Sequence, residues 1–353
     1  MSKMLDEIRE QPAALERTLK GELRGADKLR KLFAAKRPRL ILLAARGTSD
    51  NAAQFGRYLI EITTGIPTAL AAPSVFTLYK AKVDLRDTLL IAISQSGEST
   101  DTNAVLETGR RVGALTVGIT NEPNSSLAKL AEHVFLVRAG KEKSVAATKT
   151  YTGQLLSMYI LAYALGARLS LDDLRRLPEW ANTALQLETA IESLAGRYRF
   201  MDHAVVVGRG LNYSNAFEFS LKLMETCYVV AERFSSADML HGPIAMVERS
   251  FPVFVFTPPG VTWPGLRDLL DRLEKMKAET MILTDASNSE AVKLHGRSIA
   301  LPVKLGRKSY PVEELYTPIP YIIPAQIFAA KLAAEKGLDP DKPRALEKVT
   351  RTL

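Results

Sequence analysis

The sequence predicts an α/β protein built from two tandem units, each a parallel sheet flanked by helices in three α-β-α layers. Continuous apolar runs of strand length alternate with helical stretches, which is the pattern of buried parallel strands. The same pattern then recurs with an offset of about 163 residues. The chain has 353 residues, of which 46% are hydrophobic and 24% charged, and this is enough for two folded domains.

The first copy follows a polar segment, residues 5–36, whose apolar positions have helical spacing and predict two short helices. Apolar runs beyond it predict strands, and the stretches between them predict helices. The expected strands are residues 39–45, 88–94, 115–120 and 133–137, and the expected helices are residues 51–62, 100–112, 126–130 and 149–166.

The second copy repeats recognisable positions of the first. Arg46-Gly47 after the first strand is matched by Arg209-Gly210, and Glu61 is matched by Glu225. Two copies of one unit explain this better than the alternative, a single large domain with accidental similarity. The matching segments of the second copy are strands at 251–257 and 281–285 and a closing helix at 317–337. The expected divisions are N-terminal helices at 1–36, a first unit at 37–166, a helical connection at 167–198, a second unit at 199–340 and a tail at 341–353.

Composition excludes several classes of protein. The single cysteine, Cys227, rules out an intrachain disulfide and a cysteine-based zinc cluster. The charged start lacks the apolar core of a secretion signal, and the apolar runs are too short to span a bilayer. We therefore expect a cytoplasmic protein with no membrane association. The net charge of +8 is not gathered in an arm, and no nucleic-acid-binding motif is present, so anionic metabolites are the expected partners.

A turn rich in serine and glycine follows the expected strand at 88–94, with the sequence Ser94-Gln95-Ser96-Gly97-Glu98-Ser99-Thr100. Ligands bind beyond the carboxyl ends of parallel strands, and such a turn supplies hydroxyl and N–H groups for a phosphate. Thr48 and Ser49 after the first strand add two hydroxyls. The alternative, helix capping, needs only one such residue.

The corresponding segment of the second copy is Thr257-Pro258-Pro259-Gly260, which has few hydroxyls and lacks N–H donors at its prolines. The sequence therefore predicts one phosphate site per chain. The motif is neither a Walker A loop nor a dinucleotide fingerprint, so a single phosphoester is favoured over a nucleotide.

Two further features supply groups for proton transfer. His241 precedes Gly242-Pro243 in an expected tight turn, and an imidazole can donate and accept a proton near neutrality. His133, His203 and His295 are expected to be surface or packing residues. Glu218, Lys222 and Glu225 lie on one face of an expected, largely buried helix at 215–228. The alternative is an exposed salt-bridged stripe, but the flanking apolar residues argue for buried charge with a function.

The tail contains Lys348 after a proline-rich turn. Tails are usually disordered, and the alternative is a docked lid in which Lys348 acts as an amine.

These features, taken in order along the chain, resemble the sugar isomerase (SIS) family, in particular the isomerase half of glucosamine-6-phosphate synthases. The resemblance extends over nearly the whole chain and includes Gly47-Thr48-Ser49, Ser94–Glu98, Ala147-Thr148-Lys149, Glu218 to Glu225, His241-Gly242-Pro243, and Asp339–Arg344 with Lys348. It implies two tandem SIS domains and a homodimer that needs no metal or organic cofactor.

The resemblance also implies roles for individual residues. Glu225 would transfer a proton between C1 and C2, and His241 would open the sugar ring from the neighbouring subunit. Lys348 would form a Schiff base or act through its charge, and this choice stays open. Lys222 would line the site. Substrate-binding residues implied with them are Thr48, Ser49, Ser94, Gln95, Ser96, Ser99 (or Thr100), Val145, Ala147 and Glu218.

The chain differs from the glucosamine-6-phosphate synthases in two ways, and these differences determine which activity we expect. The synthases begin with a glutaminase domain that has an N-terminal cysteine, and this chain shows none. Ala147 stands where the synthases have a serine, and residues 71–75, 142–149 and 348–353 look closer to SIS-type glucosamine-6-phosphate deaminases. We expect conversion of glucosamine 6-phosphate and water into fructose 6-phosphate and ammonia.

Three alternatives remain at this point. They are a fructosamine-6-phosphate deglycase, an aminotransferase-like amino-sugar isomerase, and a phosphosugar-binding regulator. A galacto-configured substrate also stays open.

Overall fold

The computed structural model describes residues 2–294, 297–308, 312–346 and 348. The chain divides into two compact units. The first-sheet unit consists of residues 13–143, 147–175 and 345–353, and the second-sheet unit of residues 1–12, 144–146 and 176–344. His295, expected at the surface, lies outside the part of the chain that the structure describes, as does most of the tail beyond residue 346.

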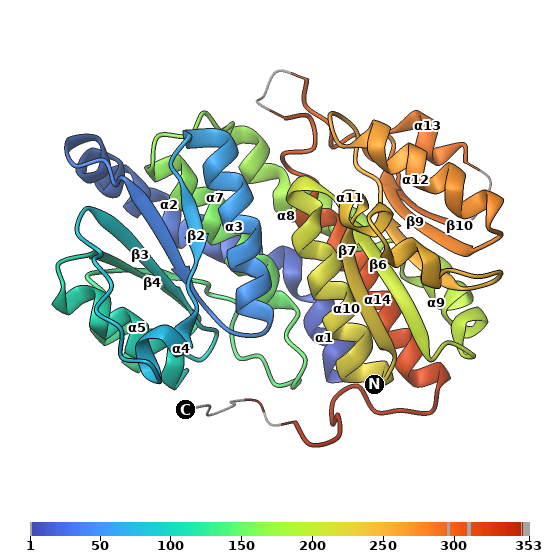
Figure 1. The fold of residues 1–353 in the computed structure, drawn as a ribbon, viewed down its shortest axis with the longest axis horizontal. Helices are drawn as coiled ribbons and strands as arrows, with labels where there is room; N and C mark the ends of the chain where they lie inside the picture. The colour runs from blue at the N-terminus through green and yellow to red at the C-terminus, as the bar shows by residue number, and fades with distance from the viewer. Residues whose placement is uncertain (1, 295–296, 309–311, 347, 349–353) are drawn as a thin grey trace. The chain divides into compact units, whose positions relative to one another are not determined.

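The first-sheet unit is built on five parallel strands in the order β2-β1-β3-β4-β5 (Figure 1). Leu42 of β1 is in register with Leu90 of β3, and Ile91 of β3 with Val117 of β4. The strands are β1 Leu40–Ala44, β2 Thr68–Leu70, β3 Thr88–Ile93, β4 Leu115–Thr120 and β5 His133–Leu136.

Helices cover both faces of this sheet. Leu42 and Leu90 point toward Val105 and Leu106 of α5, whereas their neighbours such as Ile91 are buried on the opposite face. Every residue of β3 is buried, which is why its sequence is a continuous apolar run. The helices are α2 Gln11–Ala35, α3 Thr48–Thr64, α4 Pro73–Thr77, α5 Thr100–Arg111, α6 Ser126–Leu130, α7 Lys149–Ala164 and α8 Leu171–Leu185, the first and last of which extend into the other unit.

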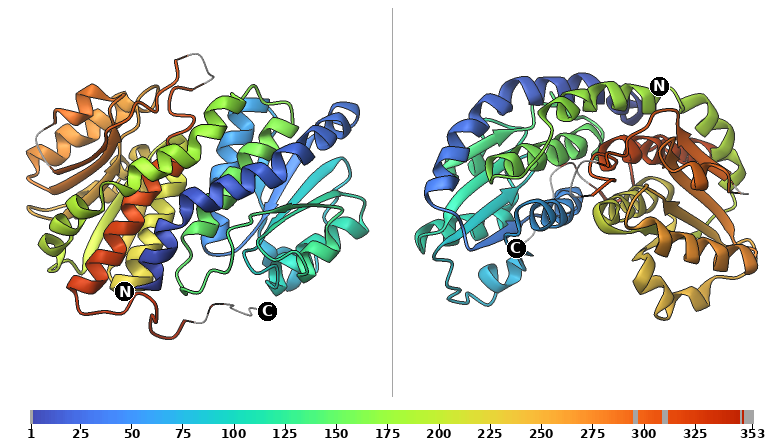
Figure 2. Two further views of the ribbon diagram at one scale, coloured as in Figure 1. Left: turned by 180° about the vertical axis from the view of Figure 1, so that it is seen from behind. Right: turned by 90° about the horizontal axis from the view of Figure 1, so that it is seen from above.

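The second-sheet unit, whose strands are coloured yellow to orange in Figure 2, repeats the arrangement. Its five parallel strands have the order β7-β6-β8-β9-β10. One face packs on an apolar cluster with α11 and α12, and the other carries edge-to-face contacts of Phe254 with Phe219 and Phe328. The strands are β6 His203–Gly208, β7 Val230–Ser235, β8 Pro252–Phe256, β9 Glu279–Asp285 and β10 Arg297–Leu301. The helices are α1 Lys3–Arg9, α9 Glu188–Ala195, α10 Tyr213–Cys227, α11 Ser236–Leu240, α12 Trp263–Lys275, α13 Ser289–Val292 and α14 Pro318–Glu335.

Two parallel five-stranded sheets flanked by helices confirm the predicted α/β class. Some elements differ from the expectation. Helix α2 has 25 residues and is not short. The sequence pattern also missed the edge strands β2, β7 and β10, because each has exposed or half-exposed positions in place of a continuous apolar run.

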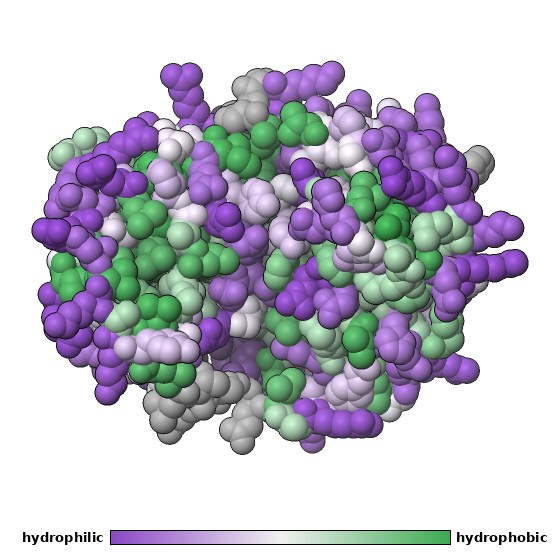
Figure 3. Space-filling view, viewed as in Figure 1, coloured by the Kyte–Doolittle hydropathy of each residue, from purple (hydrophilic) through white to green (hydrophobic). Residues whose placement is uncertain are grey.

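Surface polarity follows from this layering. Apolar side chains fill the space between sheets and helices, and hydrophilic side chains project over much of the outline of the face in Figure 3. None of the described helices is long and apolar enough to cross a membrane.

Candidate functional site

The loop after β3 turns sharply at its glycine. Gly97 has φ +67, and a Cβ there would overlap the Ser125 side chain. The Gly97 N–H donates to the Ser94 hydroxyl at 3.0 Å, and the Glu98 N–H donates to the Ser96 hydroxyl at 3.2 Å. The loop therefore curls around its own serine hydroxyls at the carboxyl end of the sheet.

Contacts with the next loop brace this turn. The Glu98 carboxylate accepts from the Ser126 N–H at 2.9 Å and from its hydroxyl at 2.7 Å. The Asn121 N–H donates to the Gln95 carbonyl at 3.1 Å, and the Asn103 side-chain amide donates to the Gly97 carbonyl at 3.0 Å. Hydrogen bonds from the following loop and from α5 thus hold the backbone of this turn in place.

Helix α5 begins at the end of this loop, and simple capping does not explain its hydroxyls. Ser99 is the N-cap residue, yet its side chain caps no backbone N–H. Its hydroxyl instead lies 3.0 Å from that of Thr102. The loop therefore brings three partly or wholly buried serines to a helix N-terminus, where N–H groups and the helix dipole favour an anion. These serines are Ser94, Ser96 and Ser99.

Residues after β1 extend the same edge of the sheet. Thr48 and Ser49 open α3, and the buried Ser49 hydroxyl accepts from the Gln154 amide at 2.9 Å. Arg46 donates to Asp101, in the first turn of α5, at 2.6 and 3.0 Å. The half-exposed guanidinium of Arg46 thus adds positive charge beside the serine loop.

The corresponding loop of the second-sheet unit is filled. Thr257, Pro258 and Pro259 are all buried, and the Thr257 hydroxyl donates to the Leu283 carbonyl. A Cβ at Gly260 would lie 2.8 Å from a Glu314 carboxylate oxygen, and one at Gly210 would lie 3.5 Å from the other. Burial raises the pKa of Glu314, which is only 2% exposed. A buried acid thus occupies the place that corresponds to the serine loop.

Helix α10 carries the three charged residues that were predicted to share a face. The Lys222 ammonium lies 2.6 Å from Glu225 Oε2 and 3.4 Å from Glu218 Oε1. The side chains of Lys222 and Glu218 are fully buried, whereas that of Glu225 is 22% exposed. The exposed-stripe alternative is therefore wrong, and Glu225 is the member of the group that can meet a ligand.

His241 follows α11 and is exposed, with Gly242 beyond it at φ +145. The turn presents the imidazole to solvent. His133 begins β5 and His203 begins β6, where both are partly or fully exposed.

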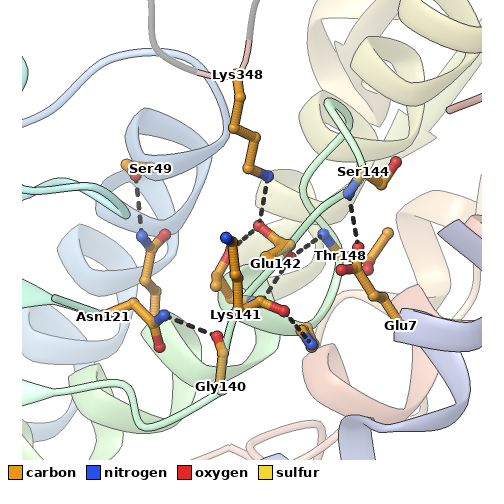
Figure 4. Close-up of polar contacts among 12 residues, drawn as sticks. Glu7, Ser49, Asn121, Gly140, Lys141, Glu142, Ser144, Thr148 and Lys348 are labelled. Carbon is orange, nitrogen blue, oxygen red and sulfur yellow. Dashed lines mark hydrogen bonds and ion pairs between the residues drawn. The ribbon is translucent and has the colours of Figure 1, made fainter. Parts of the chain in front are cut away.

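Lys348 lies against the first-sheet unit, to which it belongs. Its ammonium donates to Glu142 at 3.0 Å, and Figure 4 shows Lys348 and Thr148 converging on this carboxylate. Ala147, beside Thr148, is half-buried. Val145 is also half-buried and is grouped with the second-sheet unit, where the neighbouring Ser144 N–H donates to Glu7 at 3.1 Å.

Sequence reasoning missed Arg46 and Glu142 as site residues. Arg46 carried a signal, since it follows the first strand and recurs as Arg209 in the second copy. Glu142 carried none, because its partner Lys348 lies 206 residues away in the chain.

Cys227 is buried in α10, and its thiol lies 3.2 Å from the Ala329 carbonyl oxygen. Burial raises the pKa of the Cys227 thiol to about 11. Across the described ranges, no group of three or more His, Cys, Asp or Glu side chains could hold a metal ion.

Several known proteins are similar to this chain in sequence and in fold. The chain is 35% identical over 348 residues to the glutamine–fructose-6-phosphate aminotransferase (isomerizing) of Methanothermobacter thermautotrophicus, and 36% identical over 355 residues to that of Pyrococcus horikoshii. The matches include 98% of this chain but only 56% and 57% of those enzymes, so the chain spans little more than half the length of these relatives.

Solved structures match the fold over nearly the whole chain. The C-terminal domain of glucosamine-fructose-6-phosphate aminotransferase from Francisella tularensis is 28% identical with a TM-score of 0.86, matching 97% of this chain and 98% of that one. Glucosamine-6-phosphate deaminase from Thermotoga maritima shares the fold at 23% identity, with a TM-score of 0.79 and 99% of this chain matched to 100% of that one.

The SIS domain pattern matches residues 33–164 and 199–335. These two segments contain the two sheets, so the repeat inferred from the sequence is a repeat of this domain. The chain belongs to the SIS domain family, with two SIS domains in tandem.

Proposed function

We propose that the protein is a glucosamine-6-phosphate deaminase, which converts glucosamine 6-phosphate and water into fructose 6-phosphate and ammonia. The observation that carries the proposal is the charged group on α10. Two buried charges hold a third, the partly exposed carboxylate of Glu225. Because buried charge is costly, a fixed and accessible carboxylate of this kind supports proton transfer at a sugar carbon.

The serine loop would hold the phosphate. Its hydroxyls, the N-terminus of α5 and the nearby Arg46 guanidinium together favour a dianionic phosphoester. Ser49, Thr48 and Gln95 would complete the binding set, and Val145, Ala147 and Glu218 would line or support the sugar site. The amino-sugar and hexose phosphates named for the relatives support the same substrate class.

The reaction then needs a series of proton transfers. His241 would take the proton of the C1 hydroxyl and deliver one to the ring oxygen, opening the pyranose. Glu225 would remove the C2 proton while the aldehyde oxygen gains one, and would return a proton to C1, leaving an imine at C2. Water would add to this imine and expel ammonia. Lys222 would hold the Glu225 carboxylate in place by its contact at 2.6 Å.

The state of Cys227 bears on glutamine as a source of ammonia. Glutamine hydrolysis by a cysteine needs a reactive thiolate, and the one thiol in these 353 residues is buried with its pKa raised to about 11. These residues therefore offer no reactive thiolate for glutamine hydrolysis.

Synthesis of the amino sugar is the second candidate, and the names of the aminotransferase relatives favour it. The same groups would run the steps in reverse, from fructose 6-phosphate and free ammonia. A deglycase acting on a fructosamine 6-phosphate would also use them, with a larger amine.

The deciding experiment measures ammonia and fructose 6-phosphate together after purified protein meets glucosamine 6-phosphate. Equal amounts of both products, absent with Glu225→Gln and unchanged with Glu232→Gln, a variant of an exposed carboxylate on β7, would support the deaminase. Glucosamine 6-phosphate formed from fructose 6-phosphate and ammonium, without measurable reverse flux, would support synthesis. Absence of both reactions despite phosphosugar binding would refute both directions.

We further propose a homodimer in which His241 acts on the substrate of the neighbouring subunit. The exposed position of His241 after α11 supports such a role. Mixing inactive Glu225→Gln and His241→Asn proteins should then restore roughly a quarter of the wild-type rate, because half of the dimers are mixed and each has one intact site. No recovery after subunit exchange would place His241 in its own subunit's site.

A further inference from the structure

The start of the tail is held by the other end of the chain. Asp341 Oδ2 accepts from the Lys3 N–H at 2.7 Å, and Asp341 Oδ1 accepts from the Met4 N–H at 2.8 Å and from the Ser2 hydroxyl at 3.1 Å. All of these residues belong to the second-sheet unit, and Figure 1 shows the start of α1 beside the segment that follows α14. One carboxylate of the tail therefore binds the residues that open α1.

Asp341 does for α1 what a neighbouring residue usually does. The first N–H groups of a helix have no acceptor within it, and a side chain at the N-cap position commonly supplies one. The N-cap residue of α1 is Ser2, and its side chain caps no backbone N–H. The acceptor comes instead from a residue 338 positions from Lys3 and 337 from Met4. The cap of α1 thus also attaches the tail.

A second attachment lies at the end of α10. The Arg344 N–H donates to the Tyr228 phenol oxygen at 2.9 Å, and the Arg344 guanidinium carbon lies 4.5 Å from the centre of the Tyr228 ring. This cation–π contact adds to the hydrogen bond. Tyr228 ends α10 in the left-handed conformation, with φ +54, and follows Glu225 closely in the chain. The tail is therefore attached to the helix that carries the carboxylate of the proposed proton transfer.

The segment that contains the first attachment has a restricted backbone. The Asp341 N–H donates to the Asp339 carboxylate at 2.9 Å, which closes a tight turn. Pro340 and Pro343 are both buried, and the ring of each proline fixes its backbone angle φ. The two attachments are thus joined by a stiff piece of chain.

The chain beyond these attachments has a short reach. Four residues lead from Arg344 to Lys348, which is at most about 14 Å of fully extended chain. The resemblance described above implies that Lys348 acts on the same sugar as Glu225. A tail without attachments would carry Lys348 away from that sugar, because chain ends are mobile unless they are tied down.

We propose that Asp341 and Tyr228 are positioning residues, which fix the tail to α1 and to the end of α10 and so keep Lys348 within reach of the substrate. This inference rests on the proposed function and deepens it. It holds for either chemistry of Lys348, the Schiff base or the charge.

Trypsin measures the attachment without any turnover. Its target is the bond between Arg344 and Ala345, and cleavage requires the Arg344 side chain to leave the Tyr228 ring. Asp341→Ala removes the cap of α1, so mass spectrometry should show the chain that ends at Arg344 forming about fivefold faster, the usual effect of losing a helix cap. Asp341→Asn keeps an acceptor and should stay within about twofold of wild type.

Asp6→Asn is the matched control. Asp6 lies in the first turn of the same helix, is half-exposed and forms an ion pair with Arg9. This substitution weakens α1 through its charge and should leave the cleavage rate after Arg344 unchanged. An unchanged rate in folded Asp341→Ala, or an equal increase in Asp6→Asn, would overturn the attachment, whether or not the chain is a deaminase.

Kinetics test the link to catalysis. In Asp341→Ala the kcat for ammonia release should fall about fivefold, because Lys348 is misplaced, while the KM for glucosamine 6-phosphate stays within about twofold. Tyr228→Phe loses the acceptor of the Arg344 N–H but keeps the ring, so its kcat should fall only about twofold, and that of Tyr228→Ala about fivefold.

Two kinetic outcomes would overturn the positioning role. One is an unchanged kcat in a variant whose tail is cut faster, and the other is a loss confined to KM. Failure of wild type to release ammonia would count against the proposed function alone, and the cleavage rates would still decide whether Asp341 attaches the tail.

Discussion

The loops that follow β3 and β8 have equivalent places in two sheets of the same strand order, yet their contents differ. The first loop curls around serine hydroxyls and leads into an uncapped helix. The second is closed by two buried prolines and by the Glu314 carboxyl against Gly210 and Gly260. One fold thus carries a loop of serine hydroxyls in one copy and, in the other, an acid from its own chain beside the loop.

The difference extends to the helices that follow β1 and β6. Helix α3 opens with hydroxyl groups of Thr48 and Ser49, whereas α10 is tied at its start, where the Asn212 amide donates to Thr317 at 2.7 Å. Helix α10 in turn carries Glu225. Under the proposed function, phosphate binding would belong to one domain and proton transfer to the other.

The largest effect on activity should come from a substitution on α10. Glu225→Gln should lower kcat by about 10³-fold, within the range for removal of a general acid–base group, because the amide cannot accept the C2 proton. Phosphosugar binding, measured by calorimetry, should stay within about threefold of wild type, since the serine loop belongs to the other domain. Loss of binding in a folded variant would contradict the division of tasks.

Alanine substitutions at Gly97, in the loop after β3, and at Gly260, in the loop after β8, allow a direct comparison of the two loops. Gly97→Ala should weaken phosphosugar binding by about ten- to hundredfold, because φ +67 strains alanine and its Cβ meets Ser125. Gly260→Ala meets Glu313 and Glu314 and should lower thermal stability, with phosphosugar affinity unchanged. Equal effects of both variants on affinity would show that the second loop also binds the ligand.

A single hydroxyl should have a smaller effect. Ser96→Ala removes one hydrogen bond to a charged phosphate and should raise the dissociation constant for fructose 6-phosphate by about tenfold. The control is Thr257→Val in the second loop, whose hydroxyl bonds to the Leu283 carbonyl. That variant should lower stability and leave the dissociation constant as in wild type.

The smallest effect concerns pH and the buried acid of the second loop. Because burial raises the pKa of Glu314, its ionisation opposes folding. Stability linked to this group is complete below the ordinary carboxyl pKa of 4.5 and is lost as pH rises through the raised value.

Glu314→Gln stays neutral and should therefore lose less unfolding free energy than wild type between about pH 5 and pH 8, measured by urea denaturation. The neighbouring Glu313→Gln serves as the control. A steeper pH dependence of the unfolding free energy in Glu314→Gln would contradict the inference that folding favours the neutral form of Glu314.

Much of the candidate site could be predicted from local patterns. Ser94 to Ser99 follow a buried strand, and Glu218, Lys222 and Glu225 have helical spacing, so neighbours in sequence are neighbours in space. The contacts of Glu314 and Glu142 could not be predicted this way. Their partners, Gly260 and Lys348, lie far along the chain, and no periodicity connects them.

By itself the sequence determined the α/β class, the duplication and the unequal loops of the two copies, because buried strands and turns are encoded by adjacent residues. Only the tertiary structure decided that Glu225 keeps partial exposure while Lys222 and Glu218 are buried, that an acid lies against the second loop, and that Glu142 faces Lys348. Burial and charge pairing depend on which surfaces meet when helices close over a sheet, and these long-range contacts set the ionisation of each group.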